Sequence, residues 1–269
     1  MCCHKQYETI PPLCEPIQCG AALNPAIKGI LQDNGGENIS EKNREYCELT
    51  AHYYAWKNIE ADYYGFCHYR RFFGDEKATK RSYSAIKQPS LSQLLSEDEL
   101  RRLCGEFEII APRSEDMGLT VREHYNTSRY HYPEDLSLFL EALEEKAPEL
   151  KGAAERYLSQ GRQYFCNMFI MSKTCFDEYC SMLFPILEEF DKRKLLHGDF
   201  QSDRTDGYLG EIFTGIFICY KREDGTAIKE LPRLDTGCTV KKRLGCLVLP
   251  PESKRRFLVK GLVKKLRGK

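Results

Sequence analysis

The chain has no apolar stretch of the ~18–20 residues that a transmembrane helix requires, although 42% of its 269 residues are hydrophobic. Its first residues lack the apolar core of a signal peptide. It contains no internal repeat and no low-complexity tract. These absences argue against an integral membrane protein, a secreted protein and a repeat array, and they predict a globular protein of the cytoplasm.

Zinc-site spacing is also missing. The chain contains thirteen cysteines, but no two of them form a Cys-x-x-Cys pair. An odd number of cysteines in a chain of this length does not indicate a disulfide-bonded secreted domain either. We therefore expect reduced and mostly buried thiols.

The net charge of zero conceals an uneven distribution. Residues 253–269 hold eight of the 40 bases and none of the 40 acids, so the rest of the chain has 32 bases against 40 acids. An acidic body with a short basic tail lacks the broad positive face of a nucleic-acid-binding protein. We expect no nucleic-acid partner.

The most informative stretch is residues 33–73. It opens with Asp33-Asn34-Gly35-Gly36, a turn sequence, because Asn and Gly tolerate positive φ. A helix with Asn43 as its N-cap is predicted next, and its apolar face is formed by Tyr46, Leu49, Tyr53 and Trp56. The aromatic run 63–67 then predicts a buried strand. His68-Tyr69-Arg70-Arg71 follow at the carboxyl end of that strand.

Arg70 and Arg71 stand where open α/β sheets bind their ligands. Guanidinium groups bind phosphate in a bidentate fork, so the pair predicts a phosphate site. We assign His68 a catalytic role beside the two arginines and place Tyr69 in the same site. The alternative for Arg70 and Arg71 is a solvated surface pair, which the general exposure of arginine favours. The aromatic stripe of the preceding helix is interpreted as ordinary core.

Several motifs resemble those of one bacterial family. The run NISEKNREYCELTAHYYAWKN and the following YGFCHYRRFF carry most of the likeness. Further matches are His4-Lys5, Pro16-Ile17, Gly20-Ala21-Ala22, Asn167-Met168-Phe169-Ile170-Met171 and Gly207-Tyr208-Leu209 with Glu211. On these residues the chain is identified as a member of the family catalogued as domain of unknown function 4422, over nearly its whole length. That family occurs in capsule, exopolysaccharide and lipopolysaccharide gene contexts and is treated as glycosyltransferase-like.

The resemblance implies a GT-A-like fold, the fold of nucleotide-diphospho-sugar transferases. The chain's own alternation of strands and helices predicts an α/β protein with a mostly parallel sheet and helices on both faces. We expect a single domain over residues 1–250 and a basic amphipathic tail over 251–269.

Other residues are assigned to a sugar-donor site by their position. His4 and Lys5 follow the first strand, where a nucleotide enters a doubly wound sheet, although Lys5 could equally be a surface residue. Asp33 would bind the base or ribose of the nucleotide, or would only stabilise its own turn. Asn167 is an amide inside an otherwise apolar strand and needs partners. The predicted donor-binding residues are His4, Lys5, Asp33, Asn38, Lys42, Asn43, Tyr69, Asn167 and Arg204.

Glu211 is the predicted general base, because it is a lone carboxylate in the apolar helix around 208–218, where a buried charge requires a reason. It is preferred over Asp206, Asp203 and Asp199. The family usually pairs this glutamate with a following arginine, whereas the next residue here is Ile212. Glu211 could instead satisfy a structural arginine such as Arg204.

No carboxylate pair stands at the end of strand 63–67, where most GT-A enzymes hold a divalent metal with an Asp-x-Asp motif. We therefore expect side-chain cations to act in place of a metal, and no required cofactor. The open alternative is Mn²⁺ or Mg²⁺ bound by Asp199 or Asp203, or by His197 with either of them, in the polar loop that precedes residue 205.

These features predict a hexosyltransferase. It would move a hexose, with galactose in pyranose or furanose form as the sugar considered, from a UDP-sugar to a lipid-linked surface-polysaccharide acceptor. One alternative is a non-catalytic sugar-binding or regulatory module of polysaccharide assembly. Another is a sugar phosphotransferase, which should carry a carboxylate-held metal.

The tail predicts where the protein acts. Five apolar residues of 253–269 form one stripe of a helix whose remaining positions are largely cationic; they are Leu258, Val259, Leu262, Val263 and Leu266. This pattern is typical of a basic amphipathic helix on an anionic membrane surface. We expect peripheral association with the inner face of the cell membrane. A disordered solubilising tail is the alternative.

Overall fold

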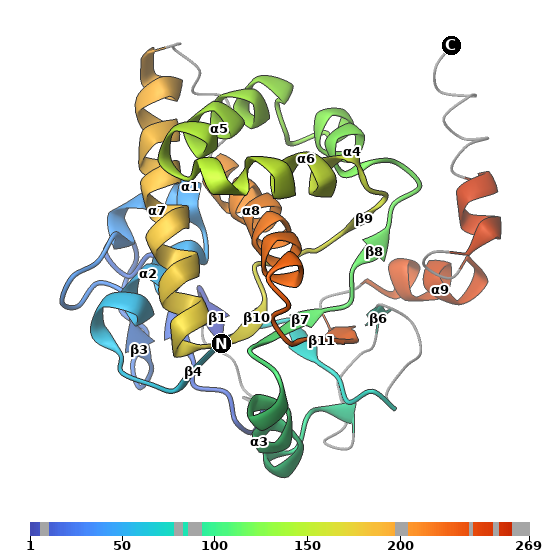
Figure 1. The fold of residues 1–269 in the computed structure, drawn as a ribbon. Helices are drawn as coiled ribbons and strands as arrows, with labels where there is room; N and C mark the ends of the chain where they lie inside the picture. Colours follow the sequence, from blue (N-terminus) through green and yellow to red (C-terminus); the bar gives the residue numbers. More distant parts are fainter. Residues whose placement is uncertain are drawn as a thin grey trace.

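The computed structural model describes residues 1–5, 11–77, 83–85, 93–196, 204–236, 239–249 and 253–259 (Figure 1). The helices are α1 (Asn43–Tyr46), α2 (Leu49–Asn58), α3 (Glu97–Glu106), α4 (Val121–Thr127), α5 (Pro133–Lys146), α6 (Lys151–Ser159), α7 (Lys173–Leu196), α8 (Thr205–Glu223) and α9 (Val240–Val248), with 3₁₀ turns η1 (Ser40–Lys42) and η3 (Pro148–Leu150). The strands are β1 (Cys2–Cys3), β2 (Ile17–Gln18), β3 (Leu31–Gln32), β4 (Tyr63–Phe66), β5 (Arg71–Phe73), β6 (Tyr83–Ala85), β7 (Ile109–Pro112), β8 (Glu115–Asp116), β9 (Arg162–Gln163), β10 (Phe169–Ser172), β11 (Ile228–Leu231) and β12 (Arg233–Asp235).

A four-stranded mixed sheet lies at the centre, in the order β11-β7-β10-β4. β11 and β7 are parallel, whereas β10 runs antiparallel to both β7 and β4. Three smaller sheets accompany it: an all-parallel β1-β2-β3, a mixed β5-β12-β6 and the antiparallel pair β8-β9. The α/β class predicted from the sequence is confirmed, but the expected mostly parallel GT-A-like sheet is not what the described residues form. Alternation of strands with helices does not fix strand direction: β7 and β10 are joined through three helices and still pair antiparallel.

Helices cover both faces of the central sheet. Successive side chains of its buried strands point to opposite faces of the sheet. Ile109, Phe169 and Met171 pack with residues of α7 and α8. Ile110 and Ile170 point the other way and pack with α3. Figure 1 shows α3 on the opposite side of the sheet from α7 and α8. The prediction of helices on both faces therefore holds for this sheet.

Local sequence signals fix the starts of two helices. Ser96 Oγ accepts a hydrogen bond from the Glu99 amide at the start of α3. Thr120 and Glu123 form a complete capping box at the start of α4. The helix predicted to follow Asn43 is interrupted, however. Cys47, with φ 52° and ψ −129°, separates α1 from α2.

At the carboxyl end, residues 254–259 are helical. The remaining tail residues, among them Leu262, Val263 and Leu266, lie outside the described part of the chain, so the amphipathic helix stays a prediction, as does the domain division at residue 250. No helix within the described residues is long and apolar enough to cross a membrane.

Candidate active site

The predicted base Glu211 lies where α8 meets the turn that precedes β10. Its Oε1 accepts a hydrogen bond of 2.8 Å from the backbone amide of Cys166. Asn167, the next residue, donates from Nδ2 to Glu48 Oε1 at 3.2 Å and to the carbonyl of Gly207 at 2.9 Å. Asn167 Oδ1 is buried without a hydrogen-bond partner. The turn that contains Cys166 and Asn167 is thus hydrogen-bonded to two carboxylates, Glu48 and Glu211.

The backbone around these residues is strained. Cys47, Cys166 and Asn167 have φ values of 52°, 84° and 46°, a region that residues with a side chain rarely occupy. Such conformations cost about 1–3 kcal/mol each and gather at functional sites. Three of them flank the same pair of carboxylates, which supports a functional reading of this region.

Two glycines bring α8 against the α1–α2 junction. A Cβ at Gly207 would stand 2.9 Å from Cys47 Sγ, and a Cβ at Gly210 would stand 2.8 Å from Leu49 Cδ1. Real Cβ atoms do not approach other atoms this closely, so a side chain at either position would force Cys47 or Leu49 to move. This close approach places Glu211, one residue after Gly210, beside Glu48.

The electrostatics of Glu211 suit a base. Burial, and next the negative charge of Glu48, raise the pKa of Glu211 from 4.5 to about 7. The Cys166 amide, Arg71 and Arg233 act in the opposite direction. Burial also raises the pKa of Glu48. Glu211 nevertheless keeps an intermediate solvent exposure, so a ligand can reach it.

Cationic side chains surround the carboxylates. Arg233 is buried, donating to Cys166 Sγ and to Glu115 Oε1. Arg204 donates from Nε to Cys47 Sγ at 3.3 Å. Arg71 opens β5 and is only partly exposed. The hydrogen bond that Glu211 accepts comes from Cys166 and not from Arg204. The alternative that Glu211 satisfies a structural arginine therefore rests on Arg71 and Arg233, whose charges lower its pKa.

His68, Tyr69, Arg70 and His4 form a second group beside the first. The His4 ring meets Tyr69 edge-on at 4.9 Å, and the Arg70 guanidinium lies 4.7 Å from the centre of the Tyr69 ring. Burial, followed by the charges of Arg71 and Arg70, lowers the pKa of His68 to about 3. Burial, and then Lys5, Arg70 and Arg204, also lowers the pKa of His4. Both imidazoles are therefore neutral at pH 7. The positive charges of the neighbouring lysine and arginine side chains create an electrostatic field that attracts an anion.

The remaining predicted donor residues precede α2 and connect to the site through Asn43, which donates to the Cys47 carbonyl. Asp33 is fully buried and accepts hydrogen bonds from the amides of Gly20 and Ala21 and from the hydroxyls of Ser40 and Thr50. This is the turn-holding role left open from the sequence.

The three residues near Asp33 also have structural partners. Asn38 Nδ2 donates to carbonyls of residues 34–36. Asn43 Nδ2 donates to the Cys47 carbonyl and to Thr50. Lys42 pairs with Asp191. Contact of these residues with a donor stays a prediction.

The metal ligands considered in the loop before α8, His197, Asp199 and Asp203, lie outside the described residues. A cavity of about 410 Å³ is present between α2, α3 and residues 11–15. Its lining is mostly apolar, as Leu13, Ile59 and Leu100 illustrate, and it includes none of the predicted site residues. This cavity is suited to an apolar group rather than to a diphosphate.

Sequence reasoning missed Glu48 and Arg233. Glu48 is in the most informative stretch of the sequence, but helical periodicity gave no sign of the break at Cys47 that turns it toward Asn167. Arg233 had one usable signal, because it is an arginine between the apolar residues Leu231 and Leu234 in a late strand.

Fold and site together define an α/β protein in which a carboxylate of raised pKa adjoins a concentration of arginine and histidine side chains. The family model described as a domain of unknown function, DUF4422, matches residues 1–222, and the chain belongs to this family.

Among solved structures, the apo structure of the bifunctional glycosyltransferase WbbM is similar to this chain, with a TM-score of 0.77 and 27% sequence identity. The match covers 88% of this chain and 45% of WbbM, so the chain corresponds to less than half of that protein's length. A comparison with curated proteins found no significant match.

Proposed function

We propose that this protein is a glycosyltransferase that moves a hexose from a UDP-sugar to a lipid-linked glycan acceptor. The observation that carries the proposal is Glu211, an accessible carboxylate whose pKa is raised to about 7 beside Arg71. A base acts best when its pKa lies near the working pH. The similarity to part of WbbM supports the enzyme class.

In the proposed reaction, an acceptor hydroxyl attacks C1 of the donor hexose. Glu211 takes the hydroxyl proton, the new glycosidic bond forms, and the bond from C1 to the diphosphate oxygen breaks with its electron pair leaving on UDP. Arg70 and Arg71, with Lys5 and Arg204 near them, offset the charge of the departing diphosphate. Side-chain cations here perform the task that a metal performs elsewhere, so the proposal requires no cofactor.

The neutral histidines have a different task. With pKa values below the ordinary range, His68 and His4 do not add charge to the site at pH 7. The Arg70 amide donates to His68 Nδ1 at 3.4 Å, which orients the ring. His4 and Tyr69 offer ring faces and edges on which a sugar or base can pack. We assign these residues to donor binding, and His68 to the reacting end of the site.

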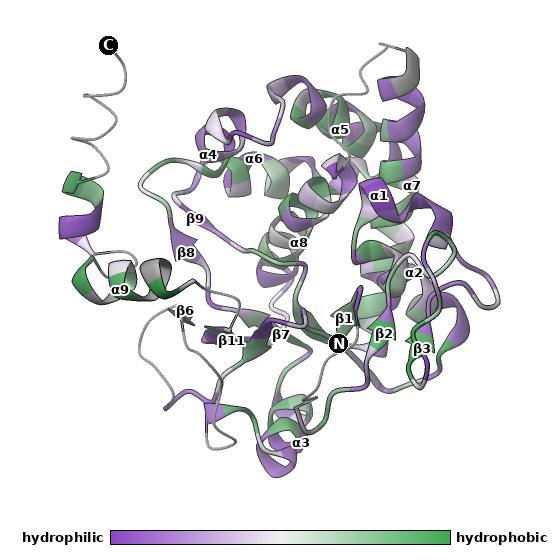
Figure 2. Cartoon of the chain, turned by 180° about the vertical axis from the view of Figure 1, so that it is seen from behind, coloured by the Kyte–Doolittle hydropathy of each residue, from purple (hydrophilic) through white to green (hydrophobic). Residues whose placement is uncertain are grey.

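We further propose that the protein docks on the inner face of the membrane, where a lipid-linked acceptor is presented. Val240, Leu244 and Val248 lie one helical turn apart on α9 and are all exposed. Leu258 and Val259 are exposed on the following helical segment. Figure 2 shows hydrophobic residues along α9 at the edge of the molecule. The eight cations of residues 253–269 supply attraction to anionic lipid.

The proposal is tested by ligand-induced thermal stabilisation of the purified chain. UDP, UDP-galactopyranose, UDP-galactofuranose, UDP-glucose and GDP-mannose are compared, each with and without Mn²⁺. A ligand present at 100 times its dissociation constant stabilises the fold by about 2.7 kcal/mol. We expect UDP-hexoses to raise the melting temperature without Mn²⁺, and release of UDP when a lipid-linked saccharide is added. Failure of every nucleotide and nucleotide-sugar to stabilise the chain would contradict the proposal.

A further inference from the structure

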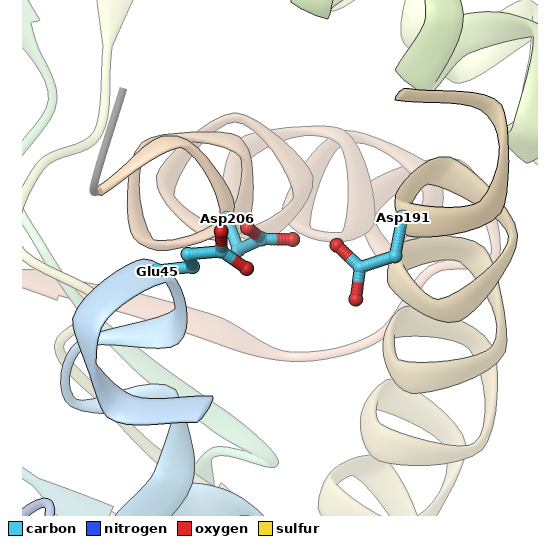
Figure 3. A group of neighbouring side chains, drawn as sticks. All are labelled: Glu45, Asp191 and Asp206. Atoms are coloured by element: carbon cyan, nitrogen blue, oxygen red, sulfur yellow. The ribbon is translucent and has the colours of Figure 1, made fainter. Parts of the chain in front are cut away.

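Three carboxylates from distant parts of the chain meet beside α8. Glu45 comes from α1, Asp191 from the last turns of α7 and Asp206 from the first turn of α8. One oxygen of each lies within 4.8 Å of the others. Figure 3 shows the three side chains directed toward a common space between the helices.

An acidic cluster alone does not indicate a ligand, but Asp206 is not an ordinary surface acid. Its side chain is 0% exposed, and neither carboxylate oxygen has a hydrogen-bond partner. Asp191 Oδ1 is likewise buried without a partner. Buried carboxylate oxygens are normally satisfied, because leaving them without a partner is costly. Three unsatisfied oxygens in one small space point to a group that is bound there.

The neighbouring side chains satisfy this cluster only in part. Asp191 Oδ2 accepts from Tyr46 Oη at 2.8 Å and pairs with Lys42 Nζ at 3.2 Å. Lys194 Nζ lies 3.7 Å from Glu45 and 3.9 Å from Asp206, beyond hydrogen-bond distance of both. Two lysines thus face three carboxylates, and the fully buried carboxylate lacks a hydrogen bond.

We propose that Glu45, Asp191 and Asp206 bind a divalent cation. All three donors are carboxylate oxygens, which are the ligands of hard ions such as Mg²⁺, Mn²⁺ and Ca²⁺ rather than of zinc or copper. Glu45 is 43% exposed and Asp191 18%, so an ion can enter from solvent. The ion completes its shell with water, and Lys194 remains beside the site with its ammonium 5.4 Å from the Phe190 ring centre.

The ion would join three helices rather than take part in sugar transfer. Asp206 and Glu211 are five residues apart on α8, which places them about 140° apart around the helix axis. Asp206 faces α1 and α7, whereas Glu211 faces the Cys166 turn. The inference is therefore independent of the proposed function. It assigns the cation the role of tying the start of α8 to α1 and α7.

The test uses the whole chain, freed of metal with a chelator and then dialysed. Its melting temperature is measured with MgCl₂, MnCl₂ or CaCl₂ and with NaCl of equal ionic strength. We expect at least one divalent salt to raise the melting temperature by several degrees above the NaCl sample. Asp206→Asn should abolish that rise, and Asp191→Asn should weaken binding at least tenfold. Glu188→Gln is the matched control, since Glu188 is an exposed α7 carboxylate that pairs with Lys192.

A second measurement does not depend on the folding of any variant. Electron paramagnetic resonance of the wild-type chain titrated with Mn²⁺ counts bound ions directly. One saturable ion per chain is expected, displaced by whichever of Mg²⁺ or Ca²⁺ binds more tightly. No saturable Mn²⁺, or equal responses of wild type and Asp206→Asn to all three salts, would overturn the proposal and leave Lys42 and Lys194 as the cations that face the cluster.

Discussion

The backbone amide of Cys166 donates a 2.8 Å hydrogen bond to Oε1 of Glu211, two residues separated by 45 positions in the sequence. Within the described residues, Oε2 of Glu211 has no hydrogen-bond partner. One oxygen is therefore held in place while the other remains available to a ligand. This is the geometry a general base needs, because its position is fixed without using its second acceptor.

Glu211→Gln separates this role from a structural one. The amide oxygen of Gln can still accept from Cys166, so the turn before β10 should be preserved. We expect UDP-sugar affinity to stay nearly intact while turnover falls at least ~100-fold, because the base is lost. Calorimetry measures the first quantity and release of UDP the second. Glu223→Gln, at the other end of α8, removes an exposed ion pair with Arg156 and should leave turnover unchanged. Wild-type turnover in Glu211→Gln would rule Glu211 out as the base.

The pKa of Glu211 also predicts how stability varies with pH. The folded-state pKa is about 7 and the ordinary value is 4.5. Between these values the unfolded chain has lost the Glu211 proton while the folded chain retains it, so the fold loses stability as pH rises. Glu211→Gln lacks this loss. The free energy of unfolding of Glu211→Gln, relative to that of wild type, should increase by at most about 3 kcal/mol between pH 4.5 and pH 7. Above pH 7 the difference should stay constant.

Urea unfolding of wild type and Glu211→Gln at pH 5 and pH 8 measures this difference. The same titration predicts that wild-type turnover rises with pH through about 7, as Glu211 becomes the carboxylate. A stability difference independent of pH would show that Glu211 titrates near its ordinary value in the folded protein.

The sequence allowed part of this site to be predicted. Glu211 could be found because a charged residue in an apolar helix is conspicuous, and Arg70 and Arg71 because they follow an aromatic strand. Cys166 and Asn167 could not be placed, since the apolar run 164–171 is typical of one continuous strand. Hydrophobic periodicity carries no information about φ, and here two consecutive residues adopt positive values. The same limit hid the break at Cys47 and with it the position of Glu48.

The fold, too, could be predicted from the sequence only in part. Helix starts at Ser96 and Thr120 were predictable because capping depends on residues three positions apart. The direction of β10 was not, because it depends on how α4, α5 and α6 carry the chain across the sheet. Long-range packing, rather than local pattern, made the central sheet mixed.

Arg70 and Arg71 can be distinguished by two readouts. Replacing both with Ala should weaken UDP binding by about 2–4 kcal/mol, taking ~1.5–3 kcal/mol for each charged hydrogen bond with overlap. Of the two, it is Arg71 whose charge is among the main causes that lower the pKa of Glu211. Arg71→Ala alone should therefore shift the pH profile of turnover upward, whereas Arg70→Ala should not. Arg101→Ala on α3, which removes an exposed pair with Glu97, is the control. Unchanged UDP affinity in the double variant would disprove the assignment.

Asp33→Asn decides between a donor-binding and a turn-holding role for this residue. The buried carboxylate accepts four hydrogen bonds, two of them from the Gly20 and Ala21 amides. An Asn amide nitrogen would face donors instead of accepting from them. We expect a loss of at least ~2 kcal/mol in the free energy of unfolding and UDP affinity close to wild type once the variant is folded. Lost UDP affinity with unchanged stability would restore the donor-binding role.

The tail gives the last prediction. A chain truncated after Pro251 should remain folded and bind UDP-sugar, because the central sheet and the Glu211 site lie entirely within the preceding residues. It does lose the contact of the Phe257 ring with Gly118 and the hydrogen bonds that Arg256 donates to the Leu249 carbonyl and to Cys246 Sγ. Full-length protein should co-sediment with anionic vesicles at low salt, since each Lys or Arg near such a surface contributes about 1 kcal/mol. Truncation removes eight of these cations and should abolish most sedimentation.

Two further samples separate charge from apolar contact. Raising the salt concentration screens the cations and should release the full-length protein. Leu244→Ser with Val248→Ser removes two exposed apolar side chains of α9 and keeps every charge. If α9 inserts beside the tail, this variant should bind anionic vesicles more weakly than wild type and more strongly than the truncated chain. Vesicles of neutral lipid should bind none of the three. Equal sedimentation of full-length and truncated chains would exclude the tail as the anchor, because the α9 side chains common to both would then account for all of the binding.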